Sequence, residues 1–69
     1  MRTNKYTYGV NEEELITAIG EYKYFATAKI FEMKTEVNHN LKRELGKTRE
    51  EARNKMRRIA EQWIQVHEK

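Results

Sequence analysis

The sequence predicts an all-α protein, an antiparallel helical hairpin with an extended N-terminal arm. Three observations predict this class. Charged residues make up 36% of the 69 residues and proline is absent, a composition that favours long helices over sheets. Helix-capping patterns occur near residue 11 and again near residue 48. Apolar residues recur at helical spacing after each of them. We therefore expect one domain over 1–69, with an arm at 1–10, a first helical segment at 11–45, a turn at 46–48 and a second helix at 49–67.

The first helix is expected over about 12–45. Asn11 is a good N-cap, and Glu14 stands three residues later, where a capping-box glutamate belongs. Gly46 suits the left-handed position after a helix C-terminus. Gly20 and Asn38–Asn40 are poor helix formers, so a kink is expected near either. Apolar residues would form a stripe on one face of this helix along its whole length: Leu15, Ile19, Tyr22, Ala26, Ile30, Met33, Val37 and Leu41.

A strand is the alternative for YKYFATAKIF, residues 22–31. Alternation would then place one apolar set on a single face: Tyr22, Tyr24, Ala26, Ala28 and Ile30. The opposite face would mix lysine, threonine and phenylalanine. We prefer the helix because it connects to the flanking caps.

The second helix begins at Thr48, with Glu51 completing another capping box. Its apolar residues are spaced alternately four and three apart, which is the pattern of a coiled-coil seam: Ala52, Met56, Ile59, Trp63 and Val66. The short connection makes the two helices antiparallel neighbours.

The two helices would differ in length, at roughly 50 Å and roughly 30 Å. An aromatic overhang on the longer one would need a cover, either a second copy in a dimeric helical bundle, the arm, or a foreign protein. The expected partner-binding or self-association residues are Tyr6, Tyr8, Leu15, Ile19, Tyr22, Tyr24, Phe25 and Phe31. Tyr24, away from the stripe, is the preferred contact with a partner.

The basic half of the chain suggests a different function. Residues 38–69 carry nine Lys/Arg and five Glu, and a row of arginines lies on one side of the second helix. The row of Arg49, Arg53 and Arg57 could contact phosphates of a nucleic acid or an acidic partner, with Arg58 as a further contact, or it could form a solvated flank. Residues 27–63 also resemble, in element order, a ribbon–helix–helix DNA-binding module, with AKIFEM as strand and TEVNHNLKREL as first helix. Arg53 and Arg57 depart from it, because that family buries apolar residues there.

No catalytic set is recognisable. The chain has no cysteine and no glycine-rich phosphate loop, and His39 and His67 have no credible zinc-binding neighbours. We expect no enzyme activity, cofactor or metal, and no membrane contact because no apolar run approaches about 20 residues. We predict a cytoplasmic, non-enzymatic protein-interaction module, an adaptor, inhibitor or assembly factor of the kind common in bacteria and phages. It would act as a homo-oligomer or dock on a larger protein. The alternative is a nucleic-acid-binding dimer.

Overall fold

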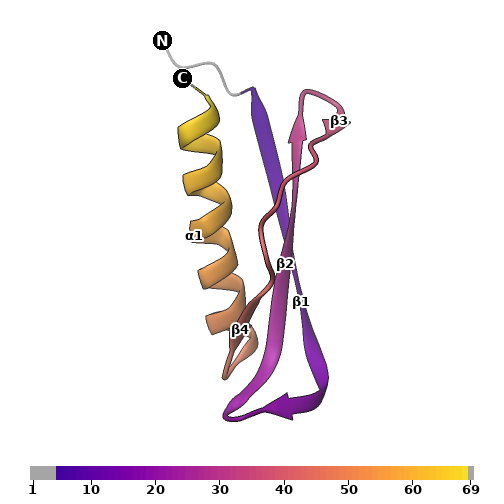
Figure 1. Ribbon diagram of the computed structural model, residues 1–69, viewed down its shortest axis with the longest axis vertical. Helices are drawn as coiled ribbons and strands as arrows, with labels where there is room; N and C mark the ends of the chain where they lie inside the picture. The colour runs from indigo at the N-terminus through magenta and orange to yellow at the C-terminus, as the bar shows by residue number, and fades with distance from the viewer. Residues whose placement is uncertain (1–4, 69) are drawn as a thin grey trace.

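A β-hairpin packed against one helix makes up the computed structural model, which describes residues 5–68 (Figure 1). The elements in chain order are β1 Tyr6–Ile19, β2 Tyr22–Glu32, β3 Thr35–Glu36, β4 Glu44–Gly46 and α1 Arg49–His67. The all-α helical hairpin predicted from the sequence is therefore wrong, and so are the long helix at 12–45, the coiled coil and the dimeric helical bundle. The strand alternative for residues 22–31 describes β2 correctly.

The hairpin is long and turns tightly at Gly20 and Glu21. Gly20 has φ +60°, a conformation that glycine adopts without steric cost at the first position of a two-residue hairpin turn. Antiparallel pairing is regular from Tyr6, opposite Glu32, to Glu14, opposite Tyr24. The register then shifts before Ile19, so the hairpin ends in an irregular segment of β1.

Both edges of strand β2 have neighbours: β1 lies along one edge, and the segment from β3 to β4 lies along the other. On the side away from β1, β4 pairs with Tyr24–Ala26, and β3 pairs with the end of β2. The connection between β3 and β4 fills the gap, because the Val37 N–H donates to the Ile30 carbonyl at 2.7 Å. His39 completes it: its Nδ1 accepts from the Leu41 N–H at 3.2 Å, so Nε2 carries the proton and donates to the Ala28 carbonyl at 2.9 Å.

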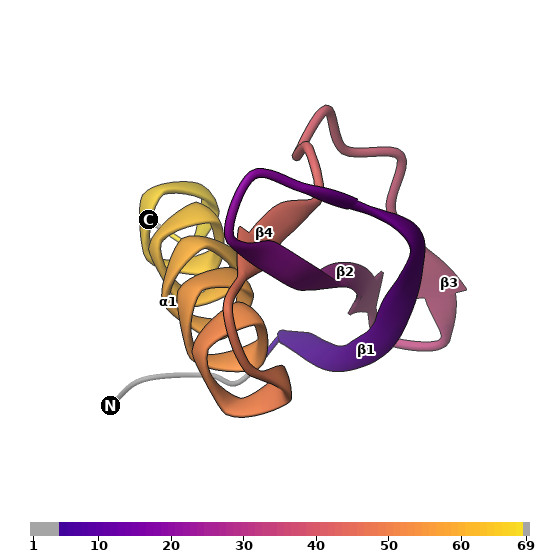
Figure 2. The ribbon, with the colours of Figure 1, turned by 90° about the horizontal axis from the view of Figure 1, so that it is seen from below.

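The core lies between α1 and one face of the sheet. Figure 2, a view along the long axis, shows α1 beside the strands. Alternate residues of each strand face the helix. Ala26, Ala28 and Ile30 of β2 are buried there. Small side chains on both layers allow close approach, and the helix contributes Ala52, Met56 and Ala60. Partly buried side chains complete the core: Tyr6, Tyr8, Val10, Tyr24, Val37, Leu41, Ile59, Trp63 and Ile64.

Helix α1 confirms the second helix of the sequence analysis. The Thr48 hydroxyl accepts from the Glu51 N–H at 3.1 Å, as an N-cap should. Ala52 and Met56 of the predicted seam are buried, and Ile59 and Trp63 pack at its border. Val66 is 65% exposed, so its predicted place in the seam was wrong.

Two predicted helix-end residues have other roles. Asn11, predicted as an N-cap, lies within β1 opposite Thr27. Gly46, predicted as a left-handed C-terminal residue, is the last residue of β4, opposite Tyr24. A Cβ on Gly46 would lie 2.4 Å from the Ala52 backbone nitrogen, so glycine is needed there for the close approach of β4 to α1.

Candidate functional site

The outer edge of β1, on the side away from β2, is the candidate binding surface. Within residues 5–68, strand β1 pairs only with β2. The Lys5 carbonyl accepts from the Met33 N–H at 3.0 Å, so the backbone groups of Lys5 point toward β2. In an antiparallel ladder the N–H and C=O of one residue point the same way, and successive residues alternate. The backbone groups of Tyr6, Tyr8, Val10 and Glu12 therefore point away from β2.

These outward backbone groups form a row available for pairing. Among residues 5–68, no strand and no backbone hydrogen bond meets them. Natural edge strands are usually protected by proline, charge, bulges or short length. From Tyr6 to Val10 the strand has none of these, since the run of glutamates starts at Glu12 and the irregular register follows Glu14. This segment can accept another strand.

Two of the predicted arginines of α1, Arg53 and Arg57, flank the same edge. Tyr8 and Val10 of β1, with Arg53 and Arg57 of α1, line a shallow groove. Arg53 Nη1 lies 3.9 Å from Glu12 Oε1, and the Arg53 side chain is 49% exposed. Further toward the hairpin turn, the Arg49 guanidinium lies 5.0 Å from the centre of the Tyr24 ring, in a cation–π contact.

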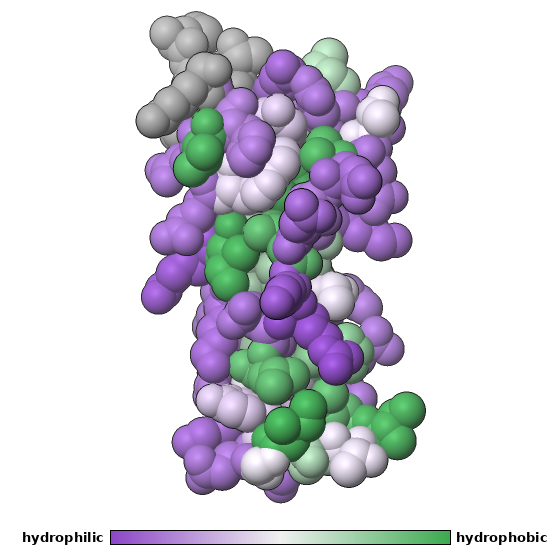
Figure 3. All heavy atoms as spheres, viewed as in Figure 1, coloured by the Kyte–Doolittle hydropathy of each residue, from purple (hydrophilic) through white to green (hydrophobic). Residues whose placement is uncertain are grey.

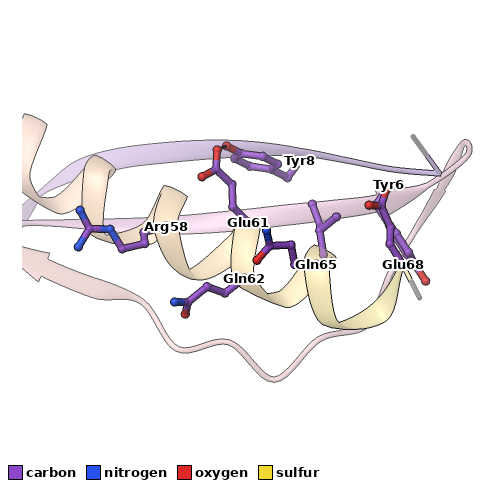
Figure 4. A pocket seen from close by; sticks show the side chains of 8 residues that line it. Tyr6, Tyr8, Arg58, Glu61, Gln62, Gln65 and Glu68 are labelled. Atoms are coloured by element: carbon purple, nitrogen blue, oxygen red, sulfur yellow. Dashed lines mark hydrogen bonds between the residues drawn. The ribbon is translucent and has the colours of Figure 1, made fainter. Parts of the chain in front are cut away.

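A second hollow continues the groove toward the C-terminus of α1 (Figure 4). The Tyr8 hydroxyl donates to Glu61 Oε2 at 2.6 Å, which joins β1 to the helix. Beyond this pair, the rings of Tyr6 and Trp63 pack edge to face, with their centres 5.4 Å apart. The His67 ring stacks on the Trp63 ring, with their centres 3.7 Å apart. Figure 4 shows Arg58 pointing away from the Tyr8–Glu61 pair.

The environment of Tyr8 raises the pKa of its hydroxyl above the ordinary value. Desolvation is the largest cause, and the hydrogen bond to Glu61 adds to it, while Arg57 acts in the opposite direction. Both leading causes favour the neutral hydroxyl over the phenolate in the folded protein. The protonated Tyr8 hydroxyl, which donates to Glu61, is therefore favoured to a higher pH than that of an ordinary tyrosine.

This contact predicts an alkaline loss of stability. Because the pKa of Tyr8 is higher in the folded than in the unfolded protein, its contribution to stability is fully present below the unfolded-state pKa of about 10. The contribution is lost as the pH rises through the folded-state pKa. Tyr8→Phe should lower the free energy of unfolding by about 1 kcal/mol near pH 7. That difference between the parent and Tyr8→Phe should shrink above about pH 10. Urea unfolding between pH 7 and 11 measures it, with Tyr6→Phe as the control. A difference that stays constant to pH 11 would contradict the assignment.

The sequence-predicted contact residues separate into different surfaces. Tyr6, Tyr8 and Tyr24 face α1 and pack on the core, so Tyr24 is not the freely presented ring expected from the helical wheel. The strand alternation places Phe25 and Phe31 on the opposite face of the sheet, where the Arg43 guanidinium lies 5.1 Å from the Phe25 ring centre.

The hairpin turn carries the remaining predicted contacts. Leu15 and Ile19 line a hollow at the turn, and apolar surface is visible at that end of the molecule (Figure 3). Ile16 beside them is fully exposed. Tyr22 begins β2, and the Lys55 ammonium lies 5.1 Å from its ring centre.

The arginines were predicted as a contact surface from the sequence, and the open edge of β1 was not. The alternation of Tyr6, Tyr8 and Val10 was the signal that could have found it, since it marks a strand with one buried face. The structure brings those residues beside Arg53 and Arg57, which are far away in the chain. Sequence spacing alone does not show that proximity.

Searches for similar proteins do not add an identity to this site. A scan against protein-family models, a search of curated proteins and a search of solved structures each found no match. Within residues 5–68, no three His, Asp or Glu side chains are grouped as metal ligands would be. The helix found in the same range is not long and apolar enough to span a membrane.

Proposed function

We propose that this protein is a non-enzymatic binding module that takes an extended segment of another protein as an additional strand on β1. The observation that carries the proposal is the outward row of backbone groups from Tyr6 to Glu12. Backbone hydrogen bonds supply affinity in strand addition, and pockets for alternate side chains supply specificity. The groove between β1 and α1 offers such pockets beside the edge.

This function is the protein interaction predicted from the sequence, on a different surface of the chain. Docking through a free aromatic end loses its main support, because Tyr24 packs on the core. Self-association and a cytoplasmic location stay predictions. Sedimentation equilibrium over a wide concentration range measures the first of them.

A proline at Val10 tests strand addition with little effect on the fold. The Val10 N–H points to the free edge, so Val10→Pro removes no bond between β1 and β2, and its ring obstructs an incoming strand. Val10→Ala is the matched control, because it loses the same packing and keeps the N–H. We expect both variants to fold with similar melting temperatures.

The binding measurement uses peptides selected from a displayed library of random twelve-residue sequences. Selected peptides should bind the parent and Val10→Ala alike, and should lose at least tenfold in affinity for Val10→Pro. Bound peptide should also slow hydrogen exchange at the Tyr8 and Val10 amides. Selected peptides that bind Val10→Pro as well as the parent, or a library that yields no binder, would show that β1 is not the binding edge.

A further inference from the structure

The chemistry beside the free edge indicates what kind of segment it accepts. Residues of an added strand that stand opposite Tyr8 and Val10 would project their side chains to the same side of the sheet as those two. That side is where α1 lies, and Arg53 and Arg57 line the groove there. The first side chains that such a segment presents to the helix therefore meet two guanidinium groups.

The repeat distances of the two elements match. Arg49, Arg53 and Arg57 follow one another at intervals of four residues. Residues four apart on a helix are separated by about 6 Å along its axis. Alternate residues of an extended strand are separated by about 6.8 Å. Acidic side chains at every second position could each meet a different arginine.

Glu12 shows how a carboxylate on this face of the sheet approaches the row. Its Oε1 lies 3.9 Å from Arg53 Nη1, although Glu12 belongs to β1 itself. At this distance the pair is loose, and a guanidinium has five N–H donors arranged for bidentate pairing with carboxylates. Arg53 therefore keeps capacity for a second carboxylate.

We infer that the β1 edge selects extended segments with acidic side chains at alternate positions, which pair with Arg53 and Arg57 while the backbone adds to β1. This inference rests on the proposed function, and it adds the chemical class of the partner. A second copy of this chain is a poorer occupant. Pairing of β1 with β1 of another copy would place both arginine rows on one side of the joined sheet, beside the shared edge, where like charges repel.

Three synthetic peptides test the inference. Acetyl-TETETET-amide carries glutamate at alternate positions, acetyl-TQTQTQT-amide replaces each glutamate by neutral glutamine, and acetyl-TEEETTT-amide has the same composition with the acids contiguous. Each is titrated into the full chain labelled with nitrogen-15, and chemical shifts of the Tyr8 and Val10 amides report the dissociation constant. We expect the alternating acidic peptide to bind at least tenfold more tightly than the other two.

Variants of the chain separate the acid recognition from strand addition. Arg53→Gln with Arg57→Gln should remove the preference for the acidic peptide, and so should 0.5 M NaCl, because exposed charge pairs are screened. Lys34→Gln with Lys42→Gln is the control for net charge, since these exposed lysines lie outside the groove. That control should keep the tenfold preference.

The outcomes distinguish the two proposals. Equal affinity for the glutamate and glutamine peptides, with both lost in Val10→Pro, would overturn acid recognition and leave strand addition supported. No binding of any peptide, or equal binding to Val10→Pro, would overturn both. If a 20-base-pair DNA duplex binds instead and loses affinity in the double arginine variant, the groove is a nucleic-acid site and the inference is wrong.

Discussion

Ile30→Ala is expected to lower the free energy of unfolding by about 2–5 kcal/mol, enough to unfold much of the protein at 25 °C. Ile30 has no exposed surface and lies in the layer between β2 and α1, next to Met56, which is equally buried. Removal of its side chain loses apolar burial and leaves a cavity between elements that have few other large core residues. A domain of this size has only about 3–5 kcal/mol of core stabilisation in total.

Ile16→Ala is the matched control, because the same side chain at the hairpin turn is fully exposed. It should change the free energy of unfolding by no more than about 0.5 kcal/mol. Urea unfolding followed by circular dichroism and Trp63 fluorescence measures both variants. Similar destabilisation by the two substitutions would mean that β2 does not present Ile30 to the helix, and the described sheet register would be wrong.

Gly46→Ala should destabilise the fold by about 1–3 kcal/mol or more, although it adds one methyl group. The new Cβ would meet the Ala52 nitrogen at 2.4 Å and the Ala52 Cα at 2.8 Å. Both are backbone atoms of the first turn of α1, so no side chain can rotate away. Either β4 must separate from β2, or the helix must move away from Ala26 and Ala28.

Gly9→Ala provides the comparison within the same sheet. A Cβ at Gly9 would have no heavy atom within 4 Å, and its φ is not positive. Alanine restricts the unfolded chain, so this substitution should be neutral or stabilising by up to about 1 kcal/mol. Thermal unfolding of the two variants in parallel tests the contrast. Equal melting temperatures would show that β4 and α1 do not approach as closely as described.

The prediction of a long helix was wrong for an identifiable reason. The capping pattern around Asn11 consists of local signals, each worth about 1 kcal/mol. A helix there would expose the aromatic residues of the overhang, whereas the hairpin packs Tyr6, Tyr8 and Tyr24, partly buried, against the core that it forms with α1. Gly20, which weakens a helix interior, takes a positive φ in the hairpin turn without strain. Tertiary packing overrode the local preference.

The candidate site was only partly predictable for a related reason. The spacing of Arg49, Arg53 and Arg57 on a helix follows from sequence, because α1 depends on local capping and a helical apolar stripe. The free edge depends on which strands pair. His39, Val37 and β4 occupy the far side of β2, and that arrangement leaves β1 open.

The sequence by itself determined α1, from the Thr48 cap to its buried Ala52 and Met56. It also contained the alternation of β1 and β2, which is compatible with a strand, although the same residues fit a helical stripe. Only the tertiary structure decided between the two. A strand buries its alternate residues only if a neighbouring strand and a covering layer exist, and those partners come from distant parts of the chain. The meeting of the β1 edge with the arginines of α1 was decided in the same way.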